Sequence, residues 1–211
     1  MKRDFYVYND QTQLSAAACT NRSDEGRSGG WWMEPSLQFR VSSRFSASMA
    51  AFYAHNIDDD QWHSNVTPTV GGPTSYTFAR LDQTTLRMTS RVNYTASPTL
   101  SVQLYAQPFV STGTYTDWKE LDDPRAEAYA GRYMRYGTTN PGGFNVRQFN
   151  SNAVVRWEYR PASTLFFVWQ QGRQANDPRA TDFSLQRDFS GLFDLHPMNT
   201  FLIKASYWFN K

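Results

Sequence analysis

The most regular feature of the sequence is a strict alternation of apolar and polar side chains. Leu100, Val102 and Leu104 alternate with Ser101 and Gln103. The same repeat recurs at 86–94, 149–160 and 201–210. A period of two residues is that of a β-strand, whose successive side chains point to opposite faces, and it excludes a helix. The sequence therefore predicts long strands with one apolar and one polar face.

The sequence predicts eight strands when segments with a less regular alternation are included. They are expected near residues 4–17, 31–41, 45–56, 76–95, 99–112, 147–160, 164–174 and 200–210. The connections are of two kinds. Tight turns are predicted at Ser42 to Arg44, Ala96 to Pro98 and Pro161 to Ser163, and long polar loops near 18–30, 57–75, 113–146 and 175–199.

The two kinds of connection alternate along the chain. In an up-and-down meander, all tight turns then lie at one end and all long loops at the other. This asymmetry, with long strands of alternating polarity, is typical of outer-membrane barrels. We therefore expect an all-β, antiparallel, up-and-down outer-membrane β-barrel, either as a single domain over residues 1–211 or as the C-terminal part of a larger barrel.

Seven polar side chains are candidates for the inside of this barrel. They are Arg87, Arg91, Gln103, Arg156, Glu158, Arg160 and Lys204. Charged groups need water or a partner, because an isolated buried charge is very costly. Inside a barrel they would select anionic or polar solutes, or form a lattice of salt bridges and hydrogen bonds. The lattice is the favoured interpretation, since narrow barrels are filled by side chains.

The apolar faces would then meet lipid. Leu100, Val102, Leu104, Val155, Trp157, Ile203 and Tyr207 are predicted to do so. Aromatic residues are expected at both interfaces, with Phe39, Phe45, Tyr94, Trp157, Tyr159, Tyr207 and Phe209 at the turn end and Tyr53, Tyr76, Phe109, Phe149 and Phe201 at the loop end. A soluble β-barrel or sandwich that binds a small ligand is the alternative, since alternation alone does not say which face is wet.

Composition narrows the function classes. The 211 residues carry a net charge of +2, with no basic run that would bind nucleic acid. Aromatics make up 16% of the chain although the mean hydropathy is -0.64, a pairing that suits a sheet with one apolar and one wet face. No apolar stretch is long enough for a membrane-spanning helix or a secretory signal. The chain is expected to be cytoplasmic or the tail of a longer exported protein.

The sequence supports no enzyme, metal or cofactor. His55 and His63 flank residues 58–60, all three of them Asp, but the calcium-loop spacing is missing, so a solvated acidic loop is favoured. An outer-membrane hydrolase is the third function considered. Ser151, Asn152 and His196 would supply its groups, yet no G-x-S-x-G elbow exists. No glycine motif suits a nucleotide phosphate.

Four phrases resemble one bacterial family. They are YTFARLDQTTL at 76–86, SVQLYAQPF at 101–109, SNAVVRWEYRP at 151–161 and NTFLIKASYWF at 199–209. This family is the C-terminal domain of unknown function in exported proteins that begin with a family-9 carbohydrate-binding-like module. The resemblance covers most of the chain from about Trp31.

The resemblance implies a Gram-negative outer-membrane barrel whose signal peptide, carbohydrate-binding-like module and earlier strands lie outside this chain. The expected function is non-enzymatic: anchoring the upstream module or passing a small polar solute. The expected partners are outer-membrane lipid, the barrel-assembly machinery and, through the upstream module, carbohydrate. Tyr207, Trp208 and Phe209 are candidates for the assembly signal, although two polar residues follow them.

Overall fold

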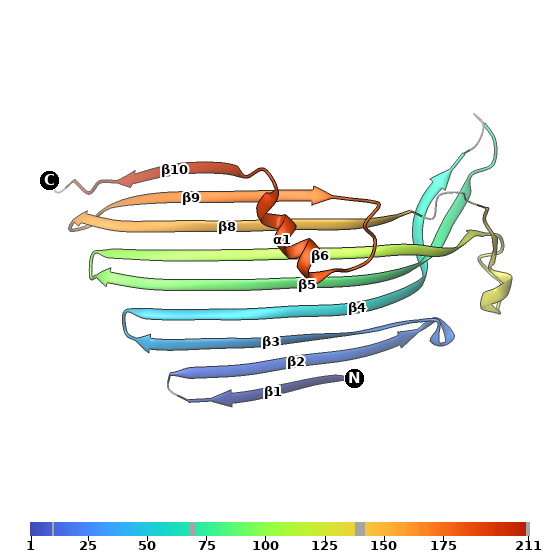
Figure 1. Cartoon of the computed structure of the whole chain (residues 1–211), viewed down its shortest axis with the longest axis horizontal. Helices are drawn as coiled ribbons and strands as arrows, with labels where there is room; N and C mark the ends of the chain where they lie inside the picture. The colour runs from blue at the N-terminus through green and yellow to red at the C-terminus, as the bar shows by residue number, and fades with distance from the viewer. Residues whose placement is uncertain (10, 68–70, 138–141, 210–211) are drawn as a thin grey trace.

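The chain forms one antiparallel β-sheet whose strands follow each other in chain order (Figure 1). The computed structural model describes residues 1–9, 11–67, 71–137 and 142–209. The strands are β1 (Lys2–Tyr8), β2 (Thr12–Ser23), β3 (Ser28–Ser42), β4 (Phe45–Val66), β5 (Ser75–Ser97), β6 (Leu100–Leu121), β7 (Tyr133–Arg135), β8 (Gly143–Arg160), β9 (Ser163–Asn176) and β10 (Met198–Ser206). The short β7 lies off the main path of the sheet and pairs with the C-terminal end of β6. The predicted all-β meander is confirmed.

The sheet is open. Strands β1 and β10 form its two edges, and within the described residues they are not paired with each other. Nine strands lie on the main path and every neighbouring pair is antiparallel, so β1 and β10 run in the same direction (Figure 1). The predicted closure into a barrel is therefore not present in this chain.

The predicted strand at 4–17 is wrong, because the chain reverses there into the β1–β2 hairpin. The side chain of Asn9 accepts hydrogen bonds from the amides of Gln11 and Thr12, at 2.9 and 2.6 Å. An Asn side chain that bonds the backbone two or three residues ahead takes the place of a backbone turn. This short polar turn lacks Gly and Pro, so the sequence pattern did not reveal it.

The three predicted tight turns are confirmed at one end of the sheet, which we call the turn end. They lie at residues 43–44, 98–99 and 161–162. In the first, the Ser42 hydroxyl accepts hydrogen bonds from the amides of Arg44 and Phe45. The opposite end, where the longer connections lie, is the loop end.

The predicted long loops are partly wrong because the strands run further than the alternation does. The expected loop at 18–30 is reduced to the single turn Asp24–Gly26 between β2 and β3. Strands β4, β5 and β6 likewise extend far into the expected loops at 57–75 and 113–146. Register shifts at 58–61, 62–64 and 78–80 interrupt the alternation in these extensions, which hides the strands from a period-two search. Residues 68–70 and 138–141 lie outside the described residues.

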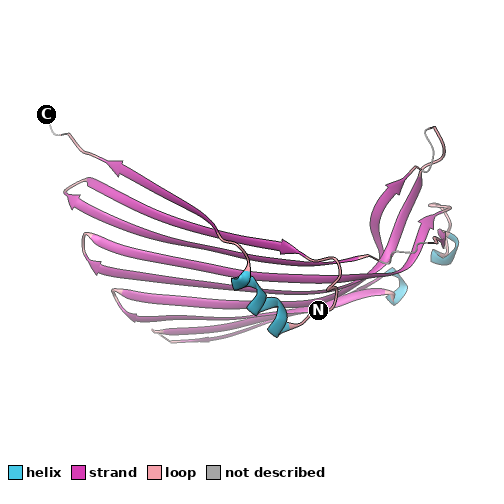
Figure 2. Ribbon diagram, turned by 45° about the horizontal axis from the view of Figure 1, so that its top comes forward, coloured by secondary structure: helices cyan, strands magenta, loops and turns pink. Residues whose placement is uncertain are grey.

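The one α-helix of the described residues, α1 (Leu185–Asp194), lies within the predicted loop at 175–199. Its N-cap residue Ser184 accepts a hydrogen bond from the amide of Arg187, as helix starts prefer. The helix packs on one face of the sheet over β6 and β8 (Figure 2). No helix in the described part of the chain has the length and apolar content needed to cross a membrane.

Few apolar side chains are buried. Among the described residues these are Ala79, Leu81, Val110, Tyr129 and Leu192. Val110 on β6 and Leu192 on α1 are fully buried, on the two elements that pack together. The other large apolar side chains along the described strands are half-buried or exposed, so the sheet has no continuous core of its own.

Leu192→Ala should release α1 from the sheet. Truncating a fully buried leucine costs about 2–5 kcal/mol, which is comparable to what one short helix gains by docking. The measurement is amide hydrogen exchange of residues 185–194, which should become much faster. Leu185→Ala is the matched control, because that leucine of the same helix is 57% exposed and its exchange should not change. Equal protection in both variants would contradict this docking.

Candidate functional site

The strand register sorts the predicted residues onto two faces of the sheet. Val102, Val155, Phe167 and Ile203 pair in one row across β6, β8, β9 and β10. The next row consists of Ser101, Arg156, Phe166 and Lys204. Directly paired residues share a face, and successive rows lie on opposite faces. The first row therefore belongs to an apolar face and the second to a polar face.

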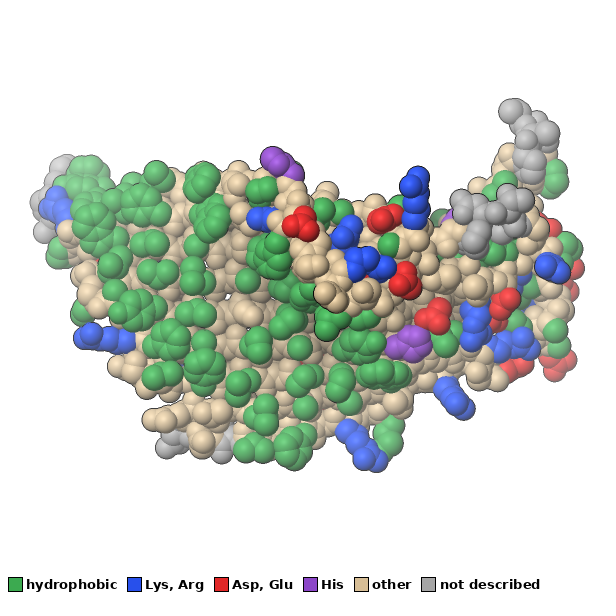
Figure 3. Space-filling model, in the orientation of Figure 1, with side chains coloured by type: hydrophobic (Ala, Val, Ile, Leu, Met, Phe, Trp, Pro, Cys, Tyr) green, Lys and Arg blue, Asp and Glu red, His purple; other side chains and the backbone are tan. Residues whose placement is uncertain are grey.

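The apolar face is broad and exposed (Figure 3). Ile203 is 69% exposed, Leu104 46% and Trp157 45%, although none of these residues is polar. Other large exposed side chains on this face are Leu14, Trp31, Met33, Met49, Tyr94, Phe167, Trp169 and Phe201. A soluble monomer rarely exposes an apolar surface of this extent.

Two rows of aromatic rings limit this apolar face. At the loop end the ring of Trp31 lies 5.3 Å from that of Tyr53, and at the turn end the rings of Phe39 and Phe45 are 6.4 Å apart. On β8 the corresponding residues are Phe149 and Trp157. In each of β3, β4 and β8, the two limiting aromatics are nine residues apart, counting both. We call the surface between the two rows the apolar band.

Two of the predicted interface aromatics lie elsewhere. Phe109 pairs with Arg87 and Gln148, which places it on the polar face, as its parity with Gln103 requires. Tyr76 lies in the extension of β5, beyond the apolar band. The residue type alone did not distinguish a ring in the band from one outside it.

The polar face carries a lattice of paired side chains. The guanidinium of Arg87 lies 3.5 Å from a carboxylate oxygen of Glu34 and covers the ring of Phe52 at 4.9 Å. The guanidinium of Arg91 covers the ring of Tyr105 at 5.5 Å.

The same lattice continues on the following strands. Arg156 forms an ion pair with Glu158 at 3.2 Å, and the amide of Gln107 donates to the hydroxyl of Thr89. The register also places Gln103 and Lys204 on this face.

Arg160 departs from the predicted set. A register shift between Glu158 and Arg160 changes its orientation, and its guanidinium instead donates to the hydroxyl of Tyr207 at 2.5 Å. Tyr207 follows the end of β10, and its ring contacts that of Phe209 at 4.5 Å. The amide of Trp208 donates to the hydroxyl of Ser163. The proposed assembly signal therefore lies beside the last tight turn, and its role stays a prediction.

A charged cluster forms in the strand extensions beyond the apolar band at the loop end. The carboxylate of Asp59 accepts hydrogen bonds from Arg80 at 3.0 Å, Lys119 at 2.9 Å and the hydroxyl of Tyr129 at 2.5 Å. The amide of Asp59 donates to the hydroxyl of Ser28. We call these five residues the Asp59 cluster. It ties β3, β4, β5 and β6 to the short turn at 129–131.

Burial shifts the pKa values in this cluster. Burial raises the pKa of Asp59, but hydrogen bonds from Tyr129, Lys119 and Arg80 outweigh it and lower that pKa to about 2. Burial and the neighbouring Asp59 carboxylate raise the pKa of Tyr129, which remains a protonated donor. The cluster is thus a satisfied ionic network with no free acid or base for catalysis among its described groups.

The candidate residues for hydrolysis and the two histidines that flank residues 58–60 take part in separate contacts. Ser151 and Asn152 are successive residues of β8 and point to opposite faces, so they do not form a catalytic group together. His55 lies 3.5 Å from Asp82, whereas His63 packs against Trp118 with ring centroids 4.5 Å apart.

The sequence does not indicate one group of acidic residues, because its members come from two different hairpins. Asp24, Asp58 and Asp60 bring one carboxylate oxygen each within 4.8 Å of one another. Burial and the nearby carboxylates of Asp58 and Asp24 raise the pKa of Asp60. From the sequence alone, residues 58–60 are grouped with the nearby histidines. Asp24 lies in the β2–β3 turn, which is distant in sequence.

Comparison with known proteins defines the class of this chain. Residues 6–210 match DUF5916, a domain of unknown function. Because the match spans nearly the whole chain, the protein belongs to the DUF5916 family. No curated protein and no solved structure matches it. The resemblance to a domain of unknown function is thereby confirmed.

Asp59→Asn should remove an acid-sensitive part of the stability. The folded pKa of Asp59, about 2, lies below the unfolded value of 3.8, so its stabilisation is present above pH 4 and is lost as the pH falls towards 2. The difference corresponds to about 2 kcal/mol. Hydrogen exchange of residues 129–135, corrected for the intrinsic effect of pH, should show this loss in the wild type but not in Asp59→Asn. Asp122→Asn, at an exposed acid of the same region, should retain the wild-type pH dependence.

Proposed function

We propose that this chain is a membrane-spanning module of a Gram-negative outer-membrane β-barrel with no enzymatic activity. The observation that carries the proposal is the exposed apolar band between two aromatic rows. Eight steps of about 3.3 Å give a strand length of about 26 Å between the rows. Transmembrane strands are tilted by about 45° and need about 9–11 residues, and nine residues lie from one row to the other.

The polar face supports the same proposal. In the barrel it faces the interior, where Arg87, Arg91, Arg156 and Lys204 meet water or partners. Three of these four cations already contact an acidic or aromatic side chain. Paired charges fill space, whereas a selective path needs charges available to the solute. We therefore favour an anchoring role over passage of a small polar solute.

The open edges require further strands in the bilayer. Unpaired backbone groups facing hydrocarbon cost several kcal/mol each, so β1 and β10 need partners there. Direct pairing of β1 with β10 would be parallel, because eight antiparallel steps separate them. An odd number of additional strands restores the antiparallel alternation that is typical of these barrels. We propose that such strands complete the barrel.

The anchored cargo is proposed from the family resemblance. In the longer protein, the barrel would hold a family-9 carbohydrate-binding-like module at the cell surface, and the barrel-assembly machinery would insert it. A soluble small-ligand binder fits less well, because its apolar face would have to pack into a closed core. Within the described residues the apolar face is instead exposed, and aromatic side chains lie along both of its margins.

Two neighbouring valines on β8 test the membrane proposal directly. Val155 lies in the apolar band and Val154 on the polar face, at almost the same depth. In phosphatidylcholine vesicles, Val155→Arg should lower the free energy of unfolding by about 2 kcal/mol, because the charge meets lipid partway between midplane and interface. Val154→Arg should change it by much less, since its side chain faces the polar interior. Urea unfolding in the vesicles measures both.

Two results would contradict the proposal. One is an equal effect of the two substitutions, because a bilayer distinguishes the faces. The other is a larger cost for Val154→Arg, which would mean that the polar face is the buried one.

A further inference from the structure

Helix α1 lies at the loop-end row of the aromatic rings. The ring of Phe193 contacts that of Phe149 at 5.4 Å, and Phe183, just before the helix, contacts Tyr53 at 6.1 Å. Phe149 and Tyr53 are limiting residues of the apolar band. The helix thus covers the outer, apolar face of the sheet at one margin of the band, and not the polar face.

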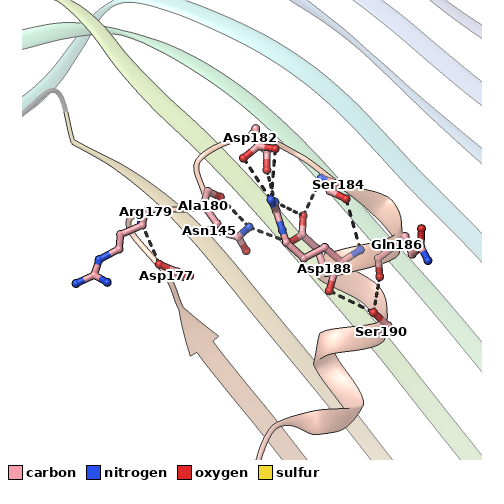
Figure 4. Close-up of polar contacts among 10 residues, drawn as sticks. Asn145, Asp177, Arg179, Ala180, Asp182, Ser184, Gln186, Asp188 and Ser190 are labelled. Carbon is pink, nitrogen blue, oxygen red and sulfur yellow. Dashed lines mark hydrogen bonds and ion pairs between the residues drawn. The ribbon is translucent and has the colours of Figure 1, made fainter.

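A network of hydrogen bonds holds the first turn of α1 to β8 and to the loop before the helix (Figure 4). The fully buried carboxylate of Asp188 accepts hydrogen bonds from the side chains of Asn145 and Arg187 and from the amide of Ser184. Asn145 precedes Phe149 on β8, on the loop side of the band. Burial raises the pKa of Asp188, but its hydrogen bonds, first that from Arg187, outweigh it and lower that pKa. The helix is therefore fixed in rotation about its own axis.

The apolar residues of α1 extend beyond the part of the helix surface that contacts the sheet. At 100° per residue, Leu185, Phe189 and Phe193 lie within an arc of about 80°, beside the buried Leu192. Leu185 is 57% exposed and Phe193 59% exposed. Gln186, Ser190 and Asp194 occupy the neighbouring polar arc. Because Phe193 of the apolar arc contacts Phe149 at the margin of the band, the apolar arc faces the band. The polar arc lies opposite the buried Asp188 and Leu192, so it points away from the sheet.

We propose that α1 is an interfacial helix whose apolar arc inserts among the phospholipids at the loop-end boundary of the bilayer. The inference rests on the membrane role proposed above and adds a second element of contact with lipid. A helix with an apolar arc on one side and polar groups on the other lies in the interface, with its apolar side about 5–10 Å deep. Continuity with the exposed band identifies lipid as the occupant of this surface.

The carbonyls at the C-terminal end of α1 are also satisfied by the sheet. Arg173 on β9 donates to the carbonyls of Phe193 and Leu195. A cation at this end interacts favourably with the helix dipole and stabilises the last turn next to the bilayer. The exposed ring of Phe193 is thus held on a fixed backbone, so that its contact with lipid costs little further ordering.

Nitroxide labels test the insertion in vesicles of phosphatidylcholine and phosphatidylglycerol. In a Cys19→Ser background, single cysteines replace Leu185 or Gln186 on α1 and Val155 or Val154 on β8. Collision with oxygen reports lipid, and collision with a water-soluble nickel complex reports water. The label at 185 should favour oxygen at a shallow depth, and the label at 186 should favour nickel. The label at 155 should lie deeper than that at 185, and the label at 154 should report the polar interior.

The outcomes separate the two proposals. If 155 reports lipid while 185 and 186 are equally open to nickel, α1 lies in water and this inference is wrong although the barrel role survives. If 155 reports water as strongly as 154, the membrane role fails and the inference fails with it.

Discussion

The structure depends on the pleat of the β-strand, which directs successive side chains to opposite faces. Over nine strands this single constraint separates the apolar from the polar residues without a second layer. The consequence is a sheet with one largely apolar face exposed and with unpaired backbone groups along both edges among the described residues. A lipid environment would turn the first of these costs into a stabilising contribution, and further strands would remove the second.

The loop end is built on a different principle. There the alternation stops, and the strand extensions are held by hydrogen bonds among charged and hydroxyl groups. Asp59 is the centre of this network, since its carboxylate accepts from three side chains on β5, on β6 and in the turn at 129–131. Such a network needs water around it, so the change from apolar rows to ionic clusters marks the height at which the proposed bilayer would end. Helix α1 lies at this boundary and carries apolar side chains on one side and polar side chains on another.

Family membership and the physical features of the sheet give different kinds of information about this protein. Membership of DUF5916 says which sequences are related and gives no activity. The exposed band, the paired polar face and the open edges are the physical features on which the proposed membrane role rests.

The sequence by itself determined the strands of the apolar band and the tight turns, because both depend on neighbours in the chain. The alternation around Val102 and Val155 is local, and so are the proline and serine residues of the turns. It did not reveal the β1–β2 turn at Asn9, because that reversal rests on two hydrogen bonds to one side chain rather than on glycine or proline.

Only the tertiary structure decided which residues meet across strands. The partners of Asp59 lie 21, 60 and 70 residues away, and the period-two pattern is broken where they meet. The rotation of Arg160 towards Tyr207 follows from a register shift that no repeat signals. The place of α1 on the apolar face was likewise beyond the sequence, since Asn145 and Phe149 on β8 hold it through contacts formed only after the sheet has assembled.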